Sequence, residues 1–304
     1  MKQLNDLVER ELGEHWREET LFYVSSGGIG QSYDTVLSLK PKQLVFDILD
    51  DNLGFPGMQE EEKAVLENQF KLLLTKATLV TAVSEYLVKK TQTQYSIPVE
   101  WLPNGVEIER FGYQNEYGRP LEELKDLSKP LFGFVGALTS WIDFELLLKI
   151  ADHPKTGTLV LVGPLVEGAV PADLVNQMKA HPKIKFLGSK PYDEVPHVLH
   201  QFDVLLLPRN YEPHSLASDP LKLYEYMATG KPIVSTALPS ALRFSRSVFV
   251  GSTHQDFLSL LERAEEEWSE QRAAEEIALV QSLSWKSRAH KLIALVEKHQ
   301  NTTC

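Results

Sequence analysis

Short apolar segments alternate with stretches of helical periodicity along most of the chain, and this alternation constrains the fold more than any other feature of the sequence. A region of Asn, Gly, Pro and charged residues at 112–130 separates two series of these segments. Expected strands lie at 21–25, 43–47, 77–83, 99–102, 131–136, 158–162, 184–187, 203–207 and 233–235. Strands separated by single helices form parallel sheets with right-handed crossovers. We therefore predict an α/β protein of two Rossmann-like domains that face a cleft, with ligands at the carboxyl ends of the strands.

Length and composition are those of a globular protein with two cores. The chain has 304 residues, of which 43% are hydrophobic and 24% are charged, and this is sufficient for two domains. We expect the first domain at 1–118 and the second at 125–284. An amphipathic helix at 285–304 is expected to pack back on the first domain.

Charge and residue content exclude several classes of function. The formal net charge of −11 argues against a general nucleic-acid role, because phosphate backbones need a basic surface. No apolar run is long enough to span a bilayer, and residues 1–14 are typical of a charged amphipathic helix, not of a signal peptide. Cys304 is the only cysteine, so neither a disulfide nor a cysteine-based metal site is expected. We predict a cytoplasmic protein.

Residues 219–236 carry the most specific local signal. Asp219 suits the N-cap of a helix, Pro220 its first position and Gly230 the position just after its last turn, before Pro232 and a buried strand. The first turn of such a helix directs free backbone N–H groups at whatever lies in front of it, which favours an anion.

Lys222 and Glu225 are three residues apart and project from one face of this helix. A cation near a helix N-terminus is unfavourable unless an anion is also there, so Lys222 favours a phosphate held at the turn that Pro220 and Leu221 begin. Glu225, one turn further along, can accept two hydrogen bonds from a diol such as a ribose. The segment therefore indicates a nucleotide-diphosphate site. The alternative is a solvated ion pair on an ordinary helix.

Three aspartates, Asp47, Asp50 and Asp51, follow the carboxyl end of the second expected strand. In parallel sheets this is where ligands bind, so one of them is a candidate acid or base, or a group that orients an acceptor hydroxyl. Asp50 and Asp51 could instead cap the following turn. A metal-binding cluster is the third option, but no histidine or further acid is nearby, and we predict no metal.

Glycines at two strand ends suggest close approach of a ligand. Gly27, Gly28 and Gly30 do not have the G-x-G-x-x-G spacing of a dinucleotide loop, and we interpret them as a backbone turn lining the cleft. Gly136 ends the first strand of the second series, where a glycine lets the main chain approach a phosphate. A simple tight turn is the alternative for Gly136.

The order of motifs resembles family 4 glycosyltransferases of the GT-B fold, from about residue 21 to about residue 296. The motifs are LPNGV at 102–106, GFVG at 133–136, LVGP at 161–164, FLG at 186–188, FDV at 202–204, LP at 207–208, the block at 220–236 and SW at 284–285. Three further segments resemble the envelope-polysaccharide transferases of the teichuronic-acid type. These are FDILDD at 46–51 with FPG at 55–57, SWIDFE at 140–145 and DPLKLYEY at 219–226.

The resemblance implies a retaining transfer of a sugar from a nucleotide donor, usually a UDP-sugar, with no metal and no further cofactor. The second domain would hold the nucleotide, and the first would bind most of the acceptor. The loop that begins at Gly188 would support the nucleobase. His214, just before the phosphate helix, would contact the donor sugar, although a lone loop histidine is more often a plain surface residue.

The chain departs from the family pattern in three places. The first domain is shorter than usual at its start, so we expect it to be incomplete. The usual partner of Glu225, a glutamate with seven residues between the two, would fall on Ala217, and the nearest acid before that position is Glu212. Trp141 and Asp143 stand where many relatives have an Arg and a Lys, so Lys222 is expected to be the main cation for the diphosphate.

These observations predict a GT-B glycosyltransferase that moves a sugar from a UDP-sugar to a cell-envelope polysaccharide or glycolipid precursor. A lipid-linked acceptor implies peripheral contact with the inner membrane face. The alternative is a non-catalytic nucleotide-binding partner derived from a shortened transferase. A nucleotide-sugar epimerase of the same fold is a third option, and it would release UDP without an acceptor.

Overall fold

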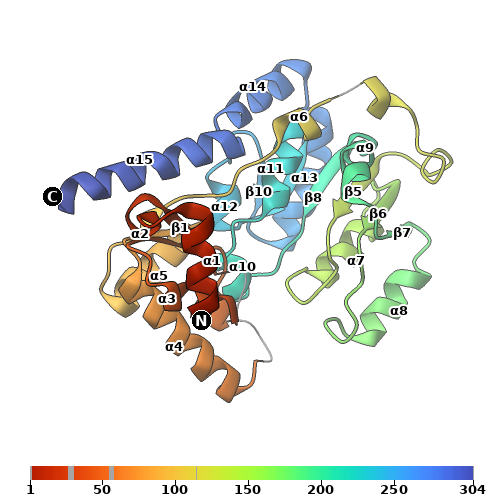
Figure 1. Cartoon of the computed structure of the whole chain (residues 1–304). Helices are drawn as coiled ribbons and strands as arrows, with labels where there is room; N and C mark the ends of the chain where they lie inside the picture. Colours follow the sequence, from red (N-terminus) through yellow and green to blue (C-terminus); the bar gives the residue numbers. More distant parts are fainter. Residues whose placement is uncertain (1, 27–30, 55–57, 114, 304) are drawn as a thin grey trace. The chain divides into compact units, whose positions relative to one another are not determined.

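The computed structural model describes residues 2–26, 31–54, 58–113 and 115–303. They form two compact units, each built around one sheet (Figure 1). The first unit comprises the described residues of Met1–Pro103, Leu216–Asp219 and Arg288–Cys304, and the second comprises those of Asn104–Ser215 and Pro220–Ser287. The α/β class and the two parallel sheets are as predicted.

The sheet of the first unit has the order β1-β2-β3-β4 and is entirely parallel. Its strands are β1 (Leu21–Ser25), β2 (Gln43–Ile48), β3 (Leu79–Ala82) and β4 (Glu100–Trp101). The helices of this unit are α1 (Lys2–Leu12), α2 (Trp16–Glu19), α3 (Gln31–Leu39), α4 (Glu60–Lys76) and α5 (Glu85–Tyr95). Short turns are η1 (Asn52–Gly54) here and η2 (Asn115–Gly118) in the second unit.

The core of the first unit lies between β2, β3 and the helices α4 and α5. Phe46 and Val80 from the strands pack with Phe70, Leu73 and Leu87 from the helices. Ser84 begins α5 by accepting a hydrogen bond from the backbone N–H of Leu87, which is the usual arrangement of a serine N-cap. Because almost every residue of β2 is buried, this strand has helices or chain on both of its faces.

The second sheet is also parallel and has the order β10-β9-β8-β5-β6-β7. Its strands are β5 (Leu131–Val135), β6 (Thr158–Val162), β7 (Ile184–Gly188), β8 (Val204–Leu207), β9 (Ile233–Thr236) and β10 (Phe249–Gly251). In chain order this is the arrangement 3-2-1-4-5-6 of a Rossmann fold. The strand order reverses between β5 and β8, and ligands of such sheets bind beyond the carboxyl ends of these two strands.

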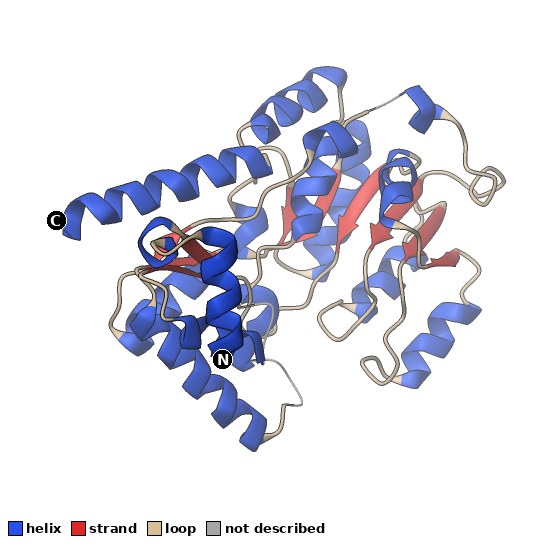
Figure 2. Ribbon diagram, viewed as in Figure 1, coloured by secondary structure: helices blue, strands red, loops and turns tan. Residues whose placement is uncertain are grey.

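Helices lie on both faces of the second sheet (Figure 2). Its helices are α6 (Ile108–Phe111), α7 (Phe144–Asp152), α8 (Ala172–Ala180), η3 (Tyr192–Glu194), α9 (Val195–His200), α11 (Leu221–Thr229), α12 (Pro239–Leu242), α13 (His254–Glu266) and α14 (Glu270–Gln281). The helices α10 (Pro213–Ala217) and α15 (Trp285–Thr303) each contain residues of both units.

The alternation of side chains along each strand supplies two separate cores to this sheet. Leu205 and Leu207 of β8 face α9, α11 and α14, whereas Val204 and Leu206 face α7 and α13. Each central strand of this sheet therefore needs a run of consecutive apolar residues, because helices cover both faces.

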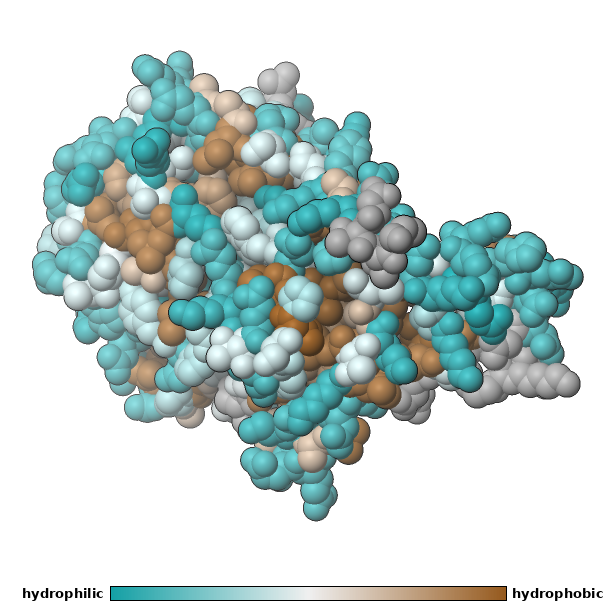
Figure 3. All heavy atoms as spheres, turned by 90° about the vertical axis from the view of Figure 1, so that its left-hand side faces the viewer, coloured by the Kyte–Doolittle hydropathy of each residue, from teal (hydrophilic) through white to brown (hydrophobic). Residues whose placement is uncertain are grey.

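On the face of the molecule in Figure 3, most surface side chains are hydrophilic and hydrophobic ones emerge in patches between them.

Most expected strands are found within one or two residues of their predicted ends, and Gly230 ends α11 in the left-handed conformation with φ of 67°. The prediction that Asp219 caps this helix is wrong. Pro220 occupies the position before the first turn, with extended dihedrals (φ −64°, ψ 122°), and no side chain caps the helix there. Because Asp219 lies one residue further out, its carboxylate cannot take the usual N-cap position.

Candidate functional site

Gly136 follows β5 directly and makes room for the side chain of Lys222. A Cβ placed on Gly136 would lie 1.8 Å from Cε and 2.6 Å from Nζ of Lys222. The backbone of Gly136 also has φ of 151°, a conformation that residues with a side chain rarely adopt. The lysine side chain therefore lies against the bare main chain at the carboxyl end of β5, and only glycine allows this contact.

The carboxyl end of β6, the strand beside β5, is packed as closely as that of β5. Gly163 follows β6 with φ of 134°, and a Cβ there would lie 2.1 Å from the carbonyl oxygen of Gly136. The N–H of Gly136 donates to the oxygen of Val162 at 2.7 Å, and the N–H of Gly163 donates to the oxygen of Gly188 at 2.8 Å. The turns after β5, β6 and β7 are thus linked, and a methyl group at Gly163 would collide with backbone that has no free rotation.

Tyr226 holds helix α11 onto the end of β5. Its hydroxyl accepts a hydrogen bond from the N–H of Val135 at 2.9 Å and donates to the oxygen of the same residue at 3.3 Å. The side chain is completely buried, and burial raises the pKa of the Tyr226 hydroxyl. Since Lys222 lies four residues before Tyr226, this anchor places the lysine one turn away, at the end of the strand.

Lys222 and Glu225 are a partly buried pair at the start of α11. Burial is the main cause that lowers the pKa of Lys222, and the nearby cation of Arg209 lowers it further, whereas Glu225 opposes both. Burial likewise raises the pKa of Glu225, against the effect of Lys222. Within the described part of the chain, the ammonium of Lys222 makes no hydrogen bond or ion pair. Such a cation is well placed to receive an anion.

Tyr192 orients Glu225 from the loop after β7. Its hydroxyl donates to Oε1 of Glu225 at 3.2 Å. Burial, followed by the charge of Glu225, raises the pKa of Tyr192 to about 12. The ring packs edge-on against Phe111, with centroids 5.8 Å apart, and the guanidinium of Arg110 lies 4.9 Å from its centre.

Gly188 begins the loop that leads to Tyr192, with φ of 67°, and a Cβ there would meet no atom within 4 Å. The space beside it is therefore open, as a supporting surface for a nucleobase requires. Leu221, in the first turn of α11, has 46% of its side chain exposed. Pro220 precedes it in extended conformation, and its oxygen accepts from the N–H of Leu223 at 3.0 Å. The N–H groups of Leu221 and Lys222 are those without an intrahelical acceptor.

A small cluster lies in the segments that follow β5 and β8. It consists of His214, Trp141 and Arg209. The rings of Trp141 and His214 have centroids 5.2 Å apart, and the guanidinium of Arg209 lies 5.7 Å from the centre of Trp141. His214 and Arg209 are both 8% exposed. Asp143, close to Trp141 in the chain, is the N-cap of α7 and accepts a hydrogen bond from the N–H of Leu146.

Asp47 lies within the first sheet, with hydroxyl donors from both neighbouring strands. Thr81 of β3 donates to Oδ1 at 2.6 Å, and Tyr23 of β1 donates to Oδ2 in a short hydrogen bond. Asp47 is only 3% exposed. Burial raises its pKa, although both hydroxyl bonds act to lower it. The carboxylate is thus held rigidly by donors and is suited to fixing the position of Tyr23, whose ring is 49% exposed.

Asp51 forms an ion pair with a lysine of α5. Nζ of Lys90 on α5 lies 2.7 Å from Oδ1 and 2.6 Å from Oδ2 of Asp51. The backbone oxygen of Asp51 accepts from Gly54, and that of Asp50 from Asn52, so both residues shape the turn η1. Asp50 is half-buried at the carboxyl end of β2 and is the acid of the three that is nearest to solvent. The expected turn at Gly27, Gly28 and Gly30, and the FPG segment at 55–57, lie outside the described residues.

The structure adds Arg209, Tyr192, Tyr226 and Gly163 to the residues selected from the sequence. Arg209 follows β8 at the switch point and supplies a second cation near Lys222. The sequence feature that could have indicated Arg209 is the LP motif at 207–208, which directly precedes it. Gly163 lay within the LVGP motif, and Tyr226 within the segment that contains Lys222. Tyr192 had no sequence signal beyond its place in the loop after Gly188.

Two properties concern metals and membranes. The parts of the chain that the structure describes contain no group of three or more His, Cys, Asp or Glu side chains arranged to hold a metal ion. Among the described helices, none has the length and apolar content needed to cross a bilayer.

The sequence of this chain is similar to known glycosyltransferases. Residues 129–261 match the model of the family described as glycosyl transferases group 1. A protein of Bacillus subtilis (strain 168), TuaH, which carries the name of a teichuronic acid biosynthesis glycosyltransferase, is 27% identical over 214 residues. The match covers 68% of this chain and 53% of that protein. The chain therefore spans about half the length of this relative.

Solved structures share the fold of the whole chain. HepE from Anabaena, crystallised with UDP, matches with a TM-score of 0.70 and 17% identity, over 97% of this chain and 83% of that chain. Sucrose-phosphate synthase from Thermosynechococcus elongatus matches with a TM-score of 0.69 and 18% identity, over 99% of this chain and 79% of that chain. The fold is that of GT-B glycosyltransferases.

Proposed function

We propose that this chain, in which residues 129–261 form a domain of the glycosyl transferases group 1 family, transfers a sugar from a UDP-sugar to a cell-envelope polysaccharide or glycolipid precursor. The observation that carries the proposal is the ammonium of Lys222, which lies over Gly136 at the switch point of the second sheet with no bonded partner among the described residues. HepE, which has the same fold, binds UDP in one crystal structure and UDP-glucose in another.

In this proposal the diphosphate of the donor lies at the first turn of α11. Its oxygens would accept from the free N–H groups that follow Pro220 and from Lys222. Glu225, whose direction Tyr192 maintains, would accept both hydroxyls of the ribose. The open side of Gly188 would support the base, and His214 would lie on the side of the sugar. No metal is needed, because the cations and the helix N-terminus offset the charge of the diphosphate.

The reaction breaks the bond between the anomeric carbon and the phosphate oxygen and forms a bond from that carbon to an acceptor hydroxyl. Negative charge grows on the departing diphosphate, so Lys222 and the helix N-terminus interact more strongly with the transition state than with the donor. The proton of the acceptor hydroxyl passes to the departing phosphate oxygen. We propose that the configuration of the anomeric carbon is retained, as the resemblance implies.

The acceptor would be oriented by the aspartates of the first unit. Asp47 and the hydroxyl of Tyr23 offer a fixed polar group, and Asp50 offers a more accessible carboxylate. We propose a lipid-linked acceptor and peripheral contact with the cytoplasmic membrane face, since TuaH is named for the synthesis of an envelope polymer.

The test measures UDP release from a panel of UDP-sugars with lipid-linked envelope precursors as acceptors. Glu225→Ala should lower the affinity for UDP by roughly 10-fold or more, because hydrogen bonds to a charged group contribute ~1.5–3 kcal/mol. Glu212→Ala, which removes an exposed glutamate from the preceding loop, is the matched control and should leave the affinity unchanged. Nuclear magnetic resonance of the product would show whether the anomeric configuration is kept. UDP binding with no turnover of any donor would contradict the transferase assignment.

A further inference from the structure

A cavity of about 400 Å³ opens between α3, β2 and α4 in the first unit. Its lining residues are Leu37, Lys40, Pro41, Leu44, Leu72 and Lys76. Leu44 lies at the start of β2, whereas Asp47 lies near the end of that strand. The cavity is therefore at the amino end of the sheet, and the acceptor side proposed above is at the carboxyl end.

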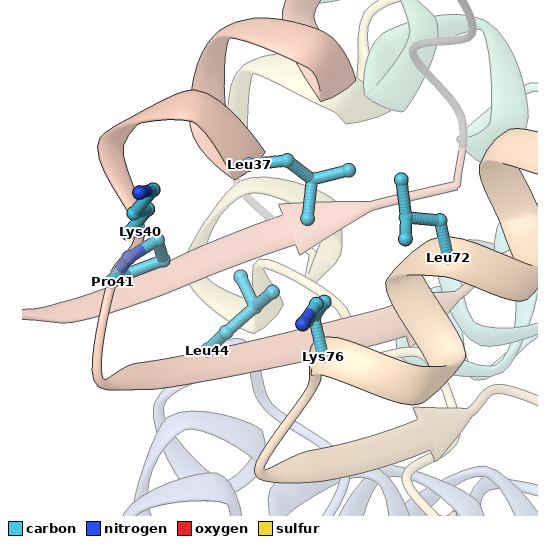
Figure 4. A pocket seen from close by; sticks show the side chains of 6 residues that line it. All are labelled: Leu37, Lys40, Pro41, Leu44, Leu72 and Lys76. Carbon is cyan, nitrogen blue, oxygen red and sulfur yellow. The ribbon is translucent and has the colours of Figure 1, made fainter.

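The interior of the cavity is apolar. Figure 4 shows Leu37, Leu44 and Leu72 around one space, with Pro41 closing it on one side. Leu44 is 1% exposed and forms the floor, whereas Leu72 is 45% exposed and lies at the mouth. A cavity of this size and lining suits an apolar chain, because such pockets are typically ~300–1,000 Å³ and mostly hydrophobic.

Two lysines at the edge of the cavity have no carboxylate partner among the described residues. Lys40 and Lys76 are exposed, and the side-chain ammonium of neither makes a hydrogen bond or ion pair within the described residues. Two other lysines of this region are compensated, since Lys42 lies 2.5 Å from Glu18 and Lys71 lies 2.7 Å from Glu67. In a chain with a net charge of −11, these two cations make the mouth of the cavity a local site for an anion.

The ends of α3 and α4 explain only part of why two lysines lie at the mouth of the cavity. Lys76 is the last residue of α4 and Lys40 follows the last residue of α3, where a cation interacts favourably with the helix dipole. That effect does not explain why an apolar cavity lies between the two charges. An apolar cavity with cations at its mouth is complementary to an amphiphile that has an anionic head.

We propose that this cavity binds an acyl chain of an anionic membrane phospholipid, whose headgroup phosphate lies between Lys40 and Lys76. The choice of a membrane lipid over a soluble amphiphile rests on the membrane contact in the proposed function. The site itself does not depend on the transfer reaction, because no residue of the donor site lines it. It would hold the amino end of the first sheet at the bilayer surface and leave the carboxyl end accessible.

The first experiment measures co-sedimentation of the full chain with vesicles of phosphatidylcholine, with and without phosphatidylglycerol. Binding is expected only to the vesicles with phosphatidylglycerol. Lys40→Gln/Lys76→Gln should weaken it about 30-fold, or about 2 kcal/mol at about 1.4 kcal/mol per tenfold, since each lysine near an anionic surface contributes about 1 kcal/mol. Lys179→Gln/Lys185→Gln changes the net charge equally at two other exposed lysines and should stay within about threefold of the wild type.

The second experiment tests the apolar interior. Leu72→Gln should weaken vesicle binding by about tenfold, and Val65→Gln, on the same helix and also exposed, should leave it unchanged. Short-chain dihexanoyl phosphatidylglycerol should bind in calorimetry, whereas glycerol phosphate should not. Circular dichroism would verify that each variant is folded.

Several outcomes would overturn the lipid site. They are equal losses in the two lysine pairs, equal losses in Leu72→Gln and Val65→Gln, equal binding of the lipid and its bare headgroup, and no binding to vesicles at all. Because the assays contain neither donor nor acceptor, each of these outcomes leaves the transferase assignment unaffected.

Discussion

Replacement of Gly136 by alanine is expected to abolish most donor binding while the protein stays folded. The new Cβ would lie 1.8 Å from Cε of Lys222, whereas carbon atoms in contact are ~3.5–4.0 Å apart. The lysine side chain is flexible at this point and must move by about 2 Å to relieve the overlap. A shift of that size breaks any hydrogen bond from its ammonium to a phosphate.

The magnitude follows from the two effects of the substitution. A charge-assisted hydrogen bond contributes ~1.5–3 kcal/mol, so the affinity for UDP should fall roughly 10- to 150-fold. The backbone conformation of Gly136, with φ of 151°, adds a cost in stability of ~1–3 kcal/mol. Calorimetry with UDP gives the first quantity, and urea unfolding gives the second.

Two comparisons isolate the collision with Lys222. Gly168→Ala places a methyl group at another glycine with positive φ, here 74°, where no atom lies within 4 Å, so it should lower stability without changing the affinity for UDP. In the Lys222→Ala background, Gly136→Ala should cost less stability and cause little further loss of UDP affinity. Unchanged UDP affinity in Gly136→Ala, or strictly additive effects in the double variant, would refute the contact as the cause.

Three further predictions concern stability and pH. Tyr226→Phe leaves the buried N–H of Val135 without its partner and should lower the unfolding free energy by ~1–3 kcal/mol in a urea titration. Burial lowers the pKa of Lys222, so UDP affinity in the wild type should decline with rising pH below the usual lysine value of about 10.4, and Lys222→Gln should lack this decline. Glu276 is 3% exposed, and burial raises its pKa well above the ordinary value. The folded protein therefore retains a proton that the unfolded chain releases above about pH 4.3, and stability falls as the pH rises through this window. Glu276→Gln should accordingly gain stability over the wild type as the pH rises above about 4.3, measured in urea titrations at a series of pH values.

Hydrophobic patterning was sufficient for most of the fold and insufficient at its smallest elements. The strands with runs of four or more apolar residues were predicted because both faces of a parallel sheet are buried. The strand β10 (Phe249–Gly251) has only three residues, and such a run cannot be distinguished from a loop by its periodicity. The helices α13 and α14, which follow this last strand, were not predicted either.

Local spacing predicted pairs of residues on one helix, but not partners from other elements. The three-residue separation of Lys222 and Glu225 places both on one face of α11, whatever surrounds them. Tyr192 lies 33 positions from Glu225, and Lys90 lies 39 positions from Asp51. Those contacts depend on how the crossovers return to the sheet. The sequence therefore could not show that the carboxylate of Asp51, one of the three candidate acids, is paired with Lys90.

The relation between Gly136 and Lys222 shows why a glycine can carry functional information that the sequence does not reveal. Flexibility and close approach of a ligand both favour glycine after a strand, and the sequence does not distinguish them. In the structure the space left by the missing Cβ is occupied by Cε of Lys222. Tyr226 keeps the lysine in that position through its two bonds to Val135. The glycine, the lysine and the tyrosine therefore act as one unit, and a substitution at any of them should change the same quantity, the position of the ammonium relative to a bound phosphate.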